Sequence, residues 1–379
     1  MEKPETAEQM AALLAGAAAD HKTVALAGAS TKANMGGPLT EAGIVVSTCA
    51  LRRVVEYDPR DLTISVEAGL PFAELSRKLA EHRQMLPLDP PFFDGATVGG
   101  VVAANCSGPR RRLYGTARDS IIGMQLATLE GKLVQSGGMV VKNVAGLDMA
   151  KLLVGSFGTL AAMTRINFKV APQPPGSRSF LMQFDKADAA IAARDAILRS
   201  VLQPAAIDLA NPPAAQRLGL EGFVLLVQAG GSSAVLDRYQ NELPGARAVE
   251  GPPEEALWRA VREFVPEFVA QREQVSVVRC SSTLAGLKDV LESSDGPILS
   301  RAGSGVSYLC FPSADSLADW MTRTAELPWH CAVEFAPAVR RTDLCLWPRT
   351  GSDFPMMERV KQMLDPHGLL NKGRLYGRI

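Results

Sequence analysis

Gly95-Ala96-Thr97-Val98-Gly99-Gly100 opens the stretch of sequence that decides the fold of this chain. Asn105 and Gly108 follow closely, and two further segments complete the stretch: Lys142-Asn143-Val144-Ala145-Gly146-Leu147-Asp148 and Gly155-Ser156-Phe157-Gly158-Thr159. Taken singly, such segments are ordinary turns, because short glycine motifs recur by chance. Small residues also let the backbone approach a ligand closely, so the order of the segments along the chain carries the information.

In this order the segments resemble the second half of the FAD-binding domain of the vanillyl-alcohol oxidase (PCMH-type) flavoproteins. Within that family, Lys142 to Gly146 and Gly108-Pro109-Arg110-Arg111 most resemble the FAD-binding E subunits of bacterial glycolate oxidases. The resemblance is strong over roughly residues 20 to 175 and weak beyond them. It implies an α+β fold, with a two-part PCMH-type FAD-binding domain and a cap domain of antiparallel sheet and helices.

The clearest linker in the chain is Ala171-Pro172-Gln173-Pro174-Pro175-Gly176, because its prolines can continue neither a helix nor a sheet ladder. We therefore expect an FAD-binding domain over residues 1–175 and a cap domain over 176–343. The resemblance implies that residues 344–379 return to the FAD-binding domain. Two runs of strand, helix, two strands and helix in the cap predict an antiparallel sheet covered by helices on one side.

The composition excludes several classes of function. Lys plus Arg and Asp plus Glu are equal at 40 each, so the chain has no overall field to attract nucleic acid. No apolar run approaches the roughly 20 residues of a membrane span, and Met1-Glu2-Lys3-Pro4-Glu5 does not resemble a signal peptide. We expect a cytoplasmic protein that associates with a membrane, if at all, through partner subunits. The six cysteines and four histidines show no local metal-binding pattern, so no metal is expected.

An anion-binding loop is predicted at Gly28-Ala29-Ser30-Thr31-Lys32-Ala33, directly after a strand pattern. Backbone N–H groups in a tight turn of small residues form a nest that suits the FAD pyrophosphate. Alone, the segment would be an ordinary turn. It also departs from the family in having Ala27 and Ala29 where relatives usually have glycine. It lacks the histidine that links flavin covalently in some members, and Cys106 is the only nearby alternative, so the FAD is expected to be noncovalent.

Further FAD contacts are implied by the resemblance at Gly95, Ala96, Thr97, Gly99, Gly100, Asn105, Gly108, Lys142, Asn143, Gly146, Gly158, Ala162 and Asn371. Glycines at a helix start cost roughly 1 kcal/mol each relative to alanine. That cost favours either a close approach to the cofactor or tight helix–sheet packing. Lys142 is either a cation that favours reduced flavin or a solvated loop lysine.

Two charged groups remain outside this set. Arg110-Arg111-Arg112 is the densest basic run and is read as a solvated loop, with a docking patch or an anion clamp as the alternative. In the cap, Glu334, Arg340 and Arg341 flank a strand expected to face the flavin, where an arginine could hold a carboxylate.

Oxidation of an α-hydroxy acid by flavin also requires a base for the hydroxyl proton and a cation for the carboxylate. No histidine pair suggests that base, so no catalytic residue is assigned. The resemblance therefore predicts an FAD-dependent oxidoreductase that is the FAD-binding subunit of a multisubunit glycolate oxidase. Its partners would be a larger FAD-binding subunit and an iron–sulfur subunit. The alternatives are an autonomous FAD-dependent 2-hydroxy-acid or alcohol dehydrogenase, and a structural subunit with a degenerate flavin site.

Overall fold

The computed structural model describes residues 1–39, 41–140, 147–271 and 273–379. They form two compact units. Unit 1 comprises residues 1–107, 115–173 and 350–379, and unit 2 comprises residues 108–114 and 174–349. Two details differ from the boundaries expected from the sequence: residues 108–114 belong to unit 2, and the chain returns to unit 1 at Thr350, not at residue 344.

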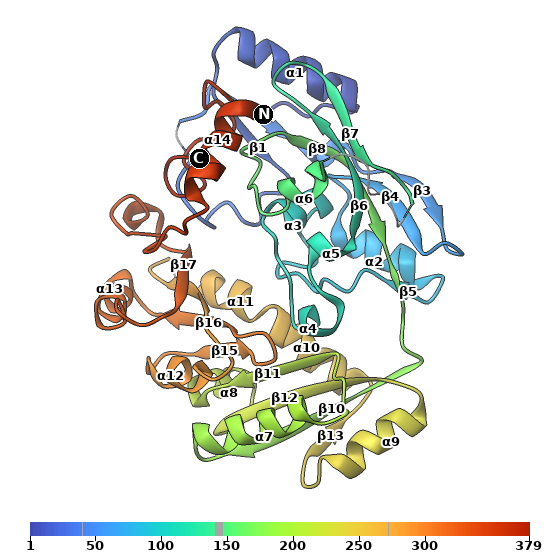
Figure 1. The fold of residues 1–379 in the computed structure, drawn as a ribbon, viewed down its shortest axis with the longest axis vertical. Coiled ribbons are helices and arrows are strands. Elements are labelled where there is room, and N and C mark those ends of the chain that lie inside the picture. Colours follow the sequence, from blue (N-terminus) through green and yellow to red (C-terminus); the bar gives the residue numbers. More distant parts are fainter. Residues whose placement is uncertain (40, 141–146, 272) are drawn as a thin grey trace. The chain divides into compact units, whose positions relative to one another are not determined.

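Unit 1 is built on an antiparallel five-stranded sheet with the strand order β3-β4-β8-β6-β7 (Figure 1). Its strands are β3 (Val54–Asp58), β4 (Thr63–Glu67), β6 (Ile121–Ala127), β7 (Leu133–Gly137) and β8 (Ala162–Lys169). The helices of this unit are α1 (Ala7–Ala19), α2 (Phe72–Ala80), α3 (Val98–Ala103), α5 (Ala117–Ser120), α6 (Met149–Leu153) and α14 (Phe354–Leu364). Two short strands, β5 (Gln84–Met85) and β9 (Ala171–Pro172), pair antiparallel to each other. Strand β9 is the last element of unit 1 before the chain enters unit 2.

Helix α1 begins where the Thr6 side chain accepts a hydrogen bond from the Gln9 N–H. This N-cap satisfies one of the backbone donors that a helix start leaves unpaired. Met10 and Leu14 lie one helical turn apart and are fully buried in one apolar cluster with Ala127 and Ala162 of the sheet. The apolar face of α1 therefore packs against strands β6 and β8.

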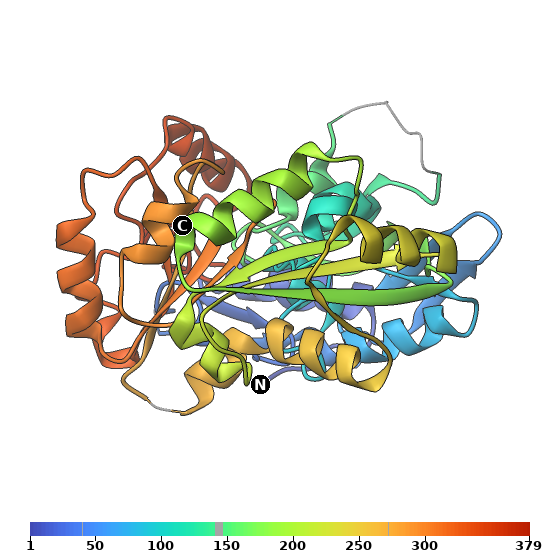
Figure 2. The same ribbon diagram turned by 90° about the horizontal axis from the view of Figure 1, so that it is seen from below.

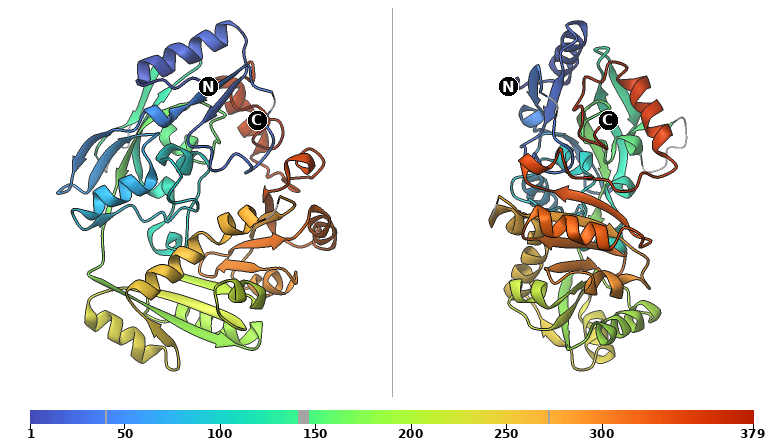
Figure 3. Two further views of the ribbon diagram at one scale, coloured as in Figure 1. Left: turned by 180° about the vertical axis from the view of Figure 1, so that it is seen from behind. Right: turned by 90° about the vertical axis from the view of Figure 1, so that its left-hand side faces the viewer.

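An N-terminal strand and a C-terminal segment lie side by side in unit 1 (Figures 1 and 3). Strand β1 (Val24–Ala27) pairs in parallel with β2 (Ile44–Ser47), and a 3₁₀ turn (Thr48–Ala50) follows β2. On its other side, Val24 of β1 forms a bridge with Leu370. The C-terminal segment therefore acts as a third, irregular strand beside β1.

Unit 2 contains an antiparallel eight-stranded sheet with the order β13-β10-β12-β11-β15-β16-β14-β17. Its strands are β10 (Gly176–Phe184), β11 (Ala206–Ala210), β12 (Phe223–Gly231), β13 (Arg247–Val249), β14 (Ser276–Ser281), β15 (Ile298–Arg301), β16 (Val306–Phe311) and β17 (His330–Phe335). The two halves meet at β11 and β15, and each half repeats the same strand order outward from that seam. The two predicted runs of strand, helix, two strands and helix correspond to these halves.

Helices cover both faces of this sheet, so the expectation of helices on one side was wrong (Figure 2). One face carries α7 (Ala187–Arg199), α9 (Ser233–Glu242), α12 (Leu287–Glu292) and α13 (Ala314–Arg323). The other carries α8 (Pro212–Arg217), α10 (Pro252–Arg262) and α11 (Phe264–Gln271). Adjacent residues of a strand point to opposite faces. Phe180 accordingly lies in the core under α7 and α9, while the neighbouring Ser179 accepts a hydrogen bond from Trp258 of α10.

The remaining elements of unit 2 are α4 (Arg111–Tyr114) and a 3₁₀ turn, Ala338–Arg340. Among the described residues, no helix is long and apolar enough to cross a membrane.

Candidate flavin site

A cleft in unit 1 collects most of the residues predicted to bind the cofactor. Eleven of them line it: Gly28, Ala29, Ser30, Thr31, Lys32, Ala33, Thr97, Gly99, Gly100, Gly158 and Asn371. They come from the loop after β1, the start of α3, the turn before β8 and the C-terminal segment. Tertiary folding therefore brings together segments that lie far apart in the sequence.

The loop after β1 leaves backbone donors free at the cleft. Within the described part of the chain, the N–H groups of Ala29 to Lys32 have no hydrogen-bond acceptor. Ser30 has φ = 58°, a left-handed conformation that is uncommon outside glycine. An alternation of right- and left-handed residues turns successive N–H groups into one concavity. The loop therefore has the geometry of an anion nest.

Gly28 is required at its position by a close approach. A Cβ atom built there would overlap Oγ1 of Thr97, the N-cap residue of α3. The loop after β1 and the start of α3 thus touch across the cleft, and only glycine allows that contact. The alanines at 27 and 29, where relatives usually have glycine, are accommodated in this arrangement.

Arg374 holds the same loop from the C-terminal side. Its guanidinium donates hydrogen bonds to the carbonyl oxygens of Ala33 at 2.8 Å, Lys32 at 3.0 Å and Gly37 at 3.3 Å. Arg374 is only 8% exposed, so these hydrogen bonds are made away from bulk solvent. Its side chain also lines the cleft. The loop is therefore held in shape before any ligand binds.

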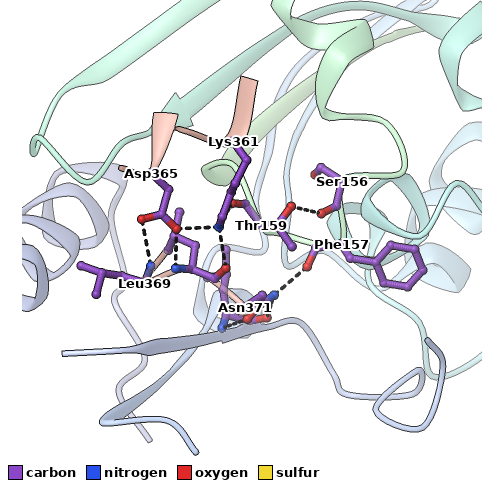
Figure 4. A network of polar contacts seen from close by, with 9 residues as sticks. Ser156, Phe157, Thr159, Lys361, Asp365, Leu369 and Asn371 are labelled. Carbon is purple, nitrogen blue, oxygen red and sulfur yellow. Dashed lines mark hydrogen bonds and ion pairs between the residues drawn. The ribbon is translucent and has the colours of Figure 1, made fainter. Parts of the chain in front are cut away.

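The C-terminal segment is anchored by a buried ion pair (Figure 4). Lys361 Nζ lies 2.6 Å from Asp365 Oδ2 and donates to the carbonyl oxygens of Thr159 at 2.7 Å and Leu370 at 3.0 Å. The Asp365 carboxylate also accepts hydrogen bonds from the N–H groups of Leu369 and Leu370, both at 2.8 Å. Burial lowers the pKa of Lys361, and the attraction of Asp365 partly opposes this effect. The pair fixes the segment that carries Asn371.

Asn371 is buried at the edge of the cleft and has φ = 42°. Its carboxamide contacts both Leu26 and Phe157, the latter through a 2.6 Å hydrogen bond from Nδ2 to the carbonyl oxygen (Figure 4). Phe157 also lines the cleft with a left-handed backbone, at φ = 51°. Strained backbone of this kind costs about 1–3 kcal/mol and concentrates at functional sites.

The two adjacent glycines at the start of α3 have different surroundings. A Cβ at Gly99 would lie 2.8 Å from Cβ and 2.9 Å from the carbonyl oxygen of Ala68, so this position requires glycine for packing. A Cβ at Gly100 would meet only Oγ1 of Thr97, at 3.1 Å, and otherwise faces open space. Tight packing therefore explains Gly99, whereas a close approach of the cofactor to Gly100 stays a prediction.

Four predicted residues of unit 1 do not line the cleft: Gly95, Ala96, Asn105 and Ala162. Ala162 illustrates the reason. It lies on β8 between Ala161 and Met163, which do line the cleft, so its own side chain points to the opposite face and packs in the core beneath α1. Gly108 belongs to unit 2. Lys142, Asn143 and Gly146 lie outside the described residues.

The sequence analysis missed several cleft residues, and most of them offer only backbone or apolar contacts. They are Leu26, Ala27, Leu39, Thr48, Ala68, Ala103, Ala104, Phe157, Ala161, Met163 and Arg374. Arg374 lies within residues 344–379, which were expected to return to the FAD-binding domain, but its carbonyl contacts depend on tertiary folding. The i, i+4 spacing of Lys361 and Asp365 was visible as a pattern, although it also fits an exposed helical pair.

The charged groups singled out in the cap lie in unit 2 and have partners there. Arg110 donates to Gln228 at 3.4 Å, and Arg340 pairs with Asp315 at 3.0 Å. Glu334 lies 3.9 Å from Arg279; burial raises the pKa of Glu334, and this positive charge partly counters the increase. Burial lowers the pKa of Arg341. Among the residues that the structure describes, no three His, Cys, Asp or Glu side chains are grouped to hold a metal ion.

Comparison with known proteins now identifies the family. Residues 2–137 match the model of an FAD binding domain. The chain is 30% identical to the glycolate oxidase subunit GlcE of Escherichia coli, over 96% of this chain and 95% of that protein. The chain belongs to the GlcE family of FAD-binding oxidoreductases. The glycolate oxidase subunit GlcD of Bacillus subtilis is also 30% identical, but only over 46% of this chain and 37% of its own length.

Solved structures of low sequence identity share the fold of this chain. A 4-ethylphenol oxidase from Gulosibacter chungangensis superposes with a TM-score of 0.74 at 16% sequence identity, covering 99% of this chain and 88% of the other. This GlcE-family chain therefore has the α+β architecture expected from its sequence, with a PCMH-type FAD-binding domain and a cap. FAD is its cofactor, and the free N–H groups of residues 29–32 suit the charge of the FAD pyrophosphate.

Proposed function

We propose that this chain is the FAD-binding subunit of a multisubunit glycolate (2-hydroxy-acid) oxidase, in the cytoplasm, with a larger FAD-binding subunit and an iron–sulfur subunit as partners. The observation that carries this proposal is the alignment with GlcE, which extends over almost the whole of both chains. The match to GlcD covers less than half of each. The cap as well as the flavin domain therefore corresponds to the E subunit.

In this proposal the cleft of unit 1 holds FAD without a covalent bond. The N–H groups of residues 29–32 would bind the pyrophosphate, with Lys32 beside them, and Thr97, Gly100 and Gly158 would line the rest of the cofactor's path. Bound FAD would supply a two-electron acceptor for the oxidation of the hydroxyl-bearing carbon of a 2-hydroxy acid to a carbonyl. Arg374, Asn371 and the Lys361–Asp365 pair keep the walls of the cleft in place.

The experiment compares the isolated chain with the chain copurified with its candidate partner subunits. Each preparation is examined for bound flavin by absorbance and for reduction of a redox dye by glycolate and lactate. We expect the isolated chain to carry FAD with little turnover, and the complex to turn over. A complex assembled with a Gly100→Val chain, which should lack FAD in this subunit, is the matched control.

Two results would favour the alternatives. Rapid reduction of the isolated chain's flavin by glycolate, near the roughly 10 per second typical of enzymes, would indicate an autonomous dehydrogenase. A chain that folds but purifies and reconstitutes without flavin would indicate a structural subunit.

A further inference from the structure

Two cysteines face each other across neighbouring strands of unit 2. Cys280 of β14 and Cys331 of β17 are direct partners in the antiparallel register, and both thiols are free. Directly opposite residues in such a ladder have Cα atoms about 4.5–5.5 Å apart and side chains on the same face. Disulfides form at Cα separations of roughly 4.4–6.8 Å. The usual spacing of such a strand pair therefore suits a disulfide between Cys280 and Cys331.

The environments of the two thiols are unequal. Cys280 is fully buried in the core beneath α12 and α13. Cys331 is partly exposed and lines a cavity of about 140 Å³, together with Trp320, Trp329 and Arg349. A small reagent can therefore reach Cys331 and not Cys280.

The local charges also distinguish them. The hydrogen bond from the Cys280 thiol, aided by the positive charge of Arg349, lowers the pKa of Cys331. The same hydrogen bond, together with burial, raises the pKa of Cys280. The thiolate is the reactive form of cysteine, so the thiol with the lowered pKa is the one that lines the cavity.

We propose that Cys331 and Cys280 form a redox-sensitive pair, in which Cys331 reacts with a small hydroperoxide and Cys280 resolves the product into a disulfide. This inference rests on unit 2 alone and does not depend on the proposed function. It assigns a modification site to a part of the protein that the flavin cleft does not include.

The chemistry balances in two steps. With hydrogen peroxide, the Cys331 thiolate attacks one peroxide oxygen, the O–O bond breaks, and the departing hydroxide takes up a proton to give water and Cys331 sulfenic acid. Cys280 sulfur then attacks the Cys331 sulfur; the sulfenic hydroxyl leaves with the Cys280 proton as a second water. Overall, two thiols are oxidised by two electrons and one peroxide is reduced to two waters.

The disulfide would join the edge strand to its neighbour, since β17 is the last strand of the sheet. An edge strand is bonded on one side only, so it is the strand most easily unpaired. Oxidation should therefore raise the thermal stability of unit 2.

The test treats the full chain with one equivalent of hydrogen peroxide, blocks free thiols with N-ethylmaleimide and maps the peptides without reduction. We expect a Cys280–Cys331 cross-link that dithiothreitol reverses. Cys345 is an exposed thiol and serves as the internal control. Oxidation of Cys345 ahead of Cys331, or no 280–331 cross-link, would overturn the proposal.

Two variants test the separate roles. Cys280→Ser should leave a Cys331 sulfenic acid that dimedone traps, with no cross-link. Arg349→Met should slow the oxidation of Cys331 by about threefold for each unit by which its pKa rises, because the lost thiolate fraction outweighs the gain in nucleophilicity. An unchanged rate in Arg349→Met would contradict the assigned role of that charge, even if Cys280→Ser fails to fold. Cys345→Ser should match the wild type.

Discussion

The side-chain carboxamide of Asn371 hydrogen-bonds both backbone groups of Leu26, a residue 345 positions earlier in the chain. Oδ1 accepts from the Leu26 N–H at 2.7 Å, and Nδ2 donates to its carbonyl oxygen at 3.0 Å. One side chain thus replaces a strand partner at the point where β1 leads into the anion-binding loop. The C-terminal segment of the chain thereby sets the position of the loop after β1.

Asn371→Asp should weaken FAD binding. Aspartate keeps the tolerance for a left-handed backbone and one acceptor but loses the donor to Leu26 and Phe157. Leaving buried carbonyls unpaired costs about 1–3 kcal/mol, equivalent to roughly tenfold in affinity if half of it falls on the bound state. FAD titration of the apoprotein by flavin fluorescence measures the change.

Asn211→Asp is the matched control, because Asn211 has the same kind of contacts in unit 2. Its Oδ1 accepts from Ala214 and Ile298, and its Nδ2 donates to Gly296 at 2.9 Å. This variant should lower the melting temperature of the protein and leave FAD affinity unchanged. Equal loss of FAD in both variants would show that Asn371 has no local role at the cleft.

Lys361→Met should destabilise unit 1 by about 3–5 kcal/mol, the usual cost of breaking a buried pair and leaving one charge behind. The Asp365 carboxylate is fully buried and would keep only its two backbone donors. Lys78→Met, which breaks the exposed pair with Glu81, should change stability far less, because solvent screens that pair. Urea unfolding of the apoproteins compares the two. A similar small effect in both would mean that the pair does not anchor the C-terminal segment.

These contacts show which parts of the site a sequence reveals. Residues 28–33 and 97–100 could be recognised because their order along the chain resembles that of the family, although each segment alone would be an ordinary turn. Lys361, Asp365 and Arg374 bind backbone carbonyls of distant segments, and no local pattern specifies such partners. Ala162 was predicted to contact the cofactor, but the cleft is lined by its neighbours Ala161 and Met163. Because adjacent residues of a strand point to opposite faces, Ala162 packs in the core instead.

The sequence of the cap contains a pattern that indicates burial of the sheet on both faces, which the prediction of helices on one side did not take into account. Strand β11, Ala206-Ile207-Asp208-Leu209-Ala210, is buried throughout, and Val224 to Val227 of β12 form a continuous apolar run. A strand exposed on one face should alternate apolar and polar residues, whereas continuous apolar runs indicate burial on both faces. The runs therefore favoured helices on both sides of the sheet, as the structure has them.

Glu334→Gln should alter the pH dependence of unit 2. Burial raises the pKa of the Glu334 carboxyl, so the folded state holds this proton more tightly than the unfolded state. Its contribution to stability is present below the unfolded value, near 4.5, and is lost as the pH rises through the raised pKa. Glutamine has no such proton, so the stability of the variant relative to wild type should increase with pH across that window.

Thermal unfolding between pH 4.5 and pH 8 measures the difference. Removing the opposing charge with Arg279→Met should raise the pKa of Glu334 further and extend the same loss to higher pH. A relative stability of Glu334→Gln that is constant with pH would contradict the burial of this carboxyl.

Acid precipitation should release all of the flavin. The anion-binding loop contains no histidine or cysteine, and the Cys106 thiol contacts the carbonyl oxygen of Ala104 and does not line the described part of the cleft. Trichloroacetic acid should therefore leave the yellow colour in the supernatant. Flavin fluorescence that stays with the protein pellet, and is absent from a Cys106→Ser pellet, would instead indicate a covalent link.

The last prediction separates the two adjacent glycines of α3. Gly100→Val should abolish FAD binding while the apoprotein keeps its melting temperature to within a few degrees, because a side chain at 100 enters the cleft and meets only Thr97. Gly99→Ala should lower the melting temperature of the apoprotein, because its methyl group would press on Cβ and the carbonyl oxygen of Ala68. Overpacking of this kind costs about 1–3 kcal/mol. The ratio of flavin to protein absorbance and the unfolding of both apoproteins give the readouts. Full FAD occupancy in Gly100→Val would show that the cofactor does not pass the start of α3, and the assignment of this cleft would have to be abandoned.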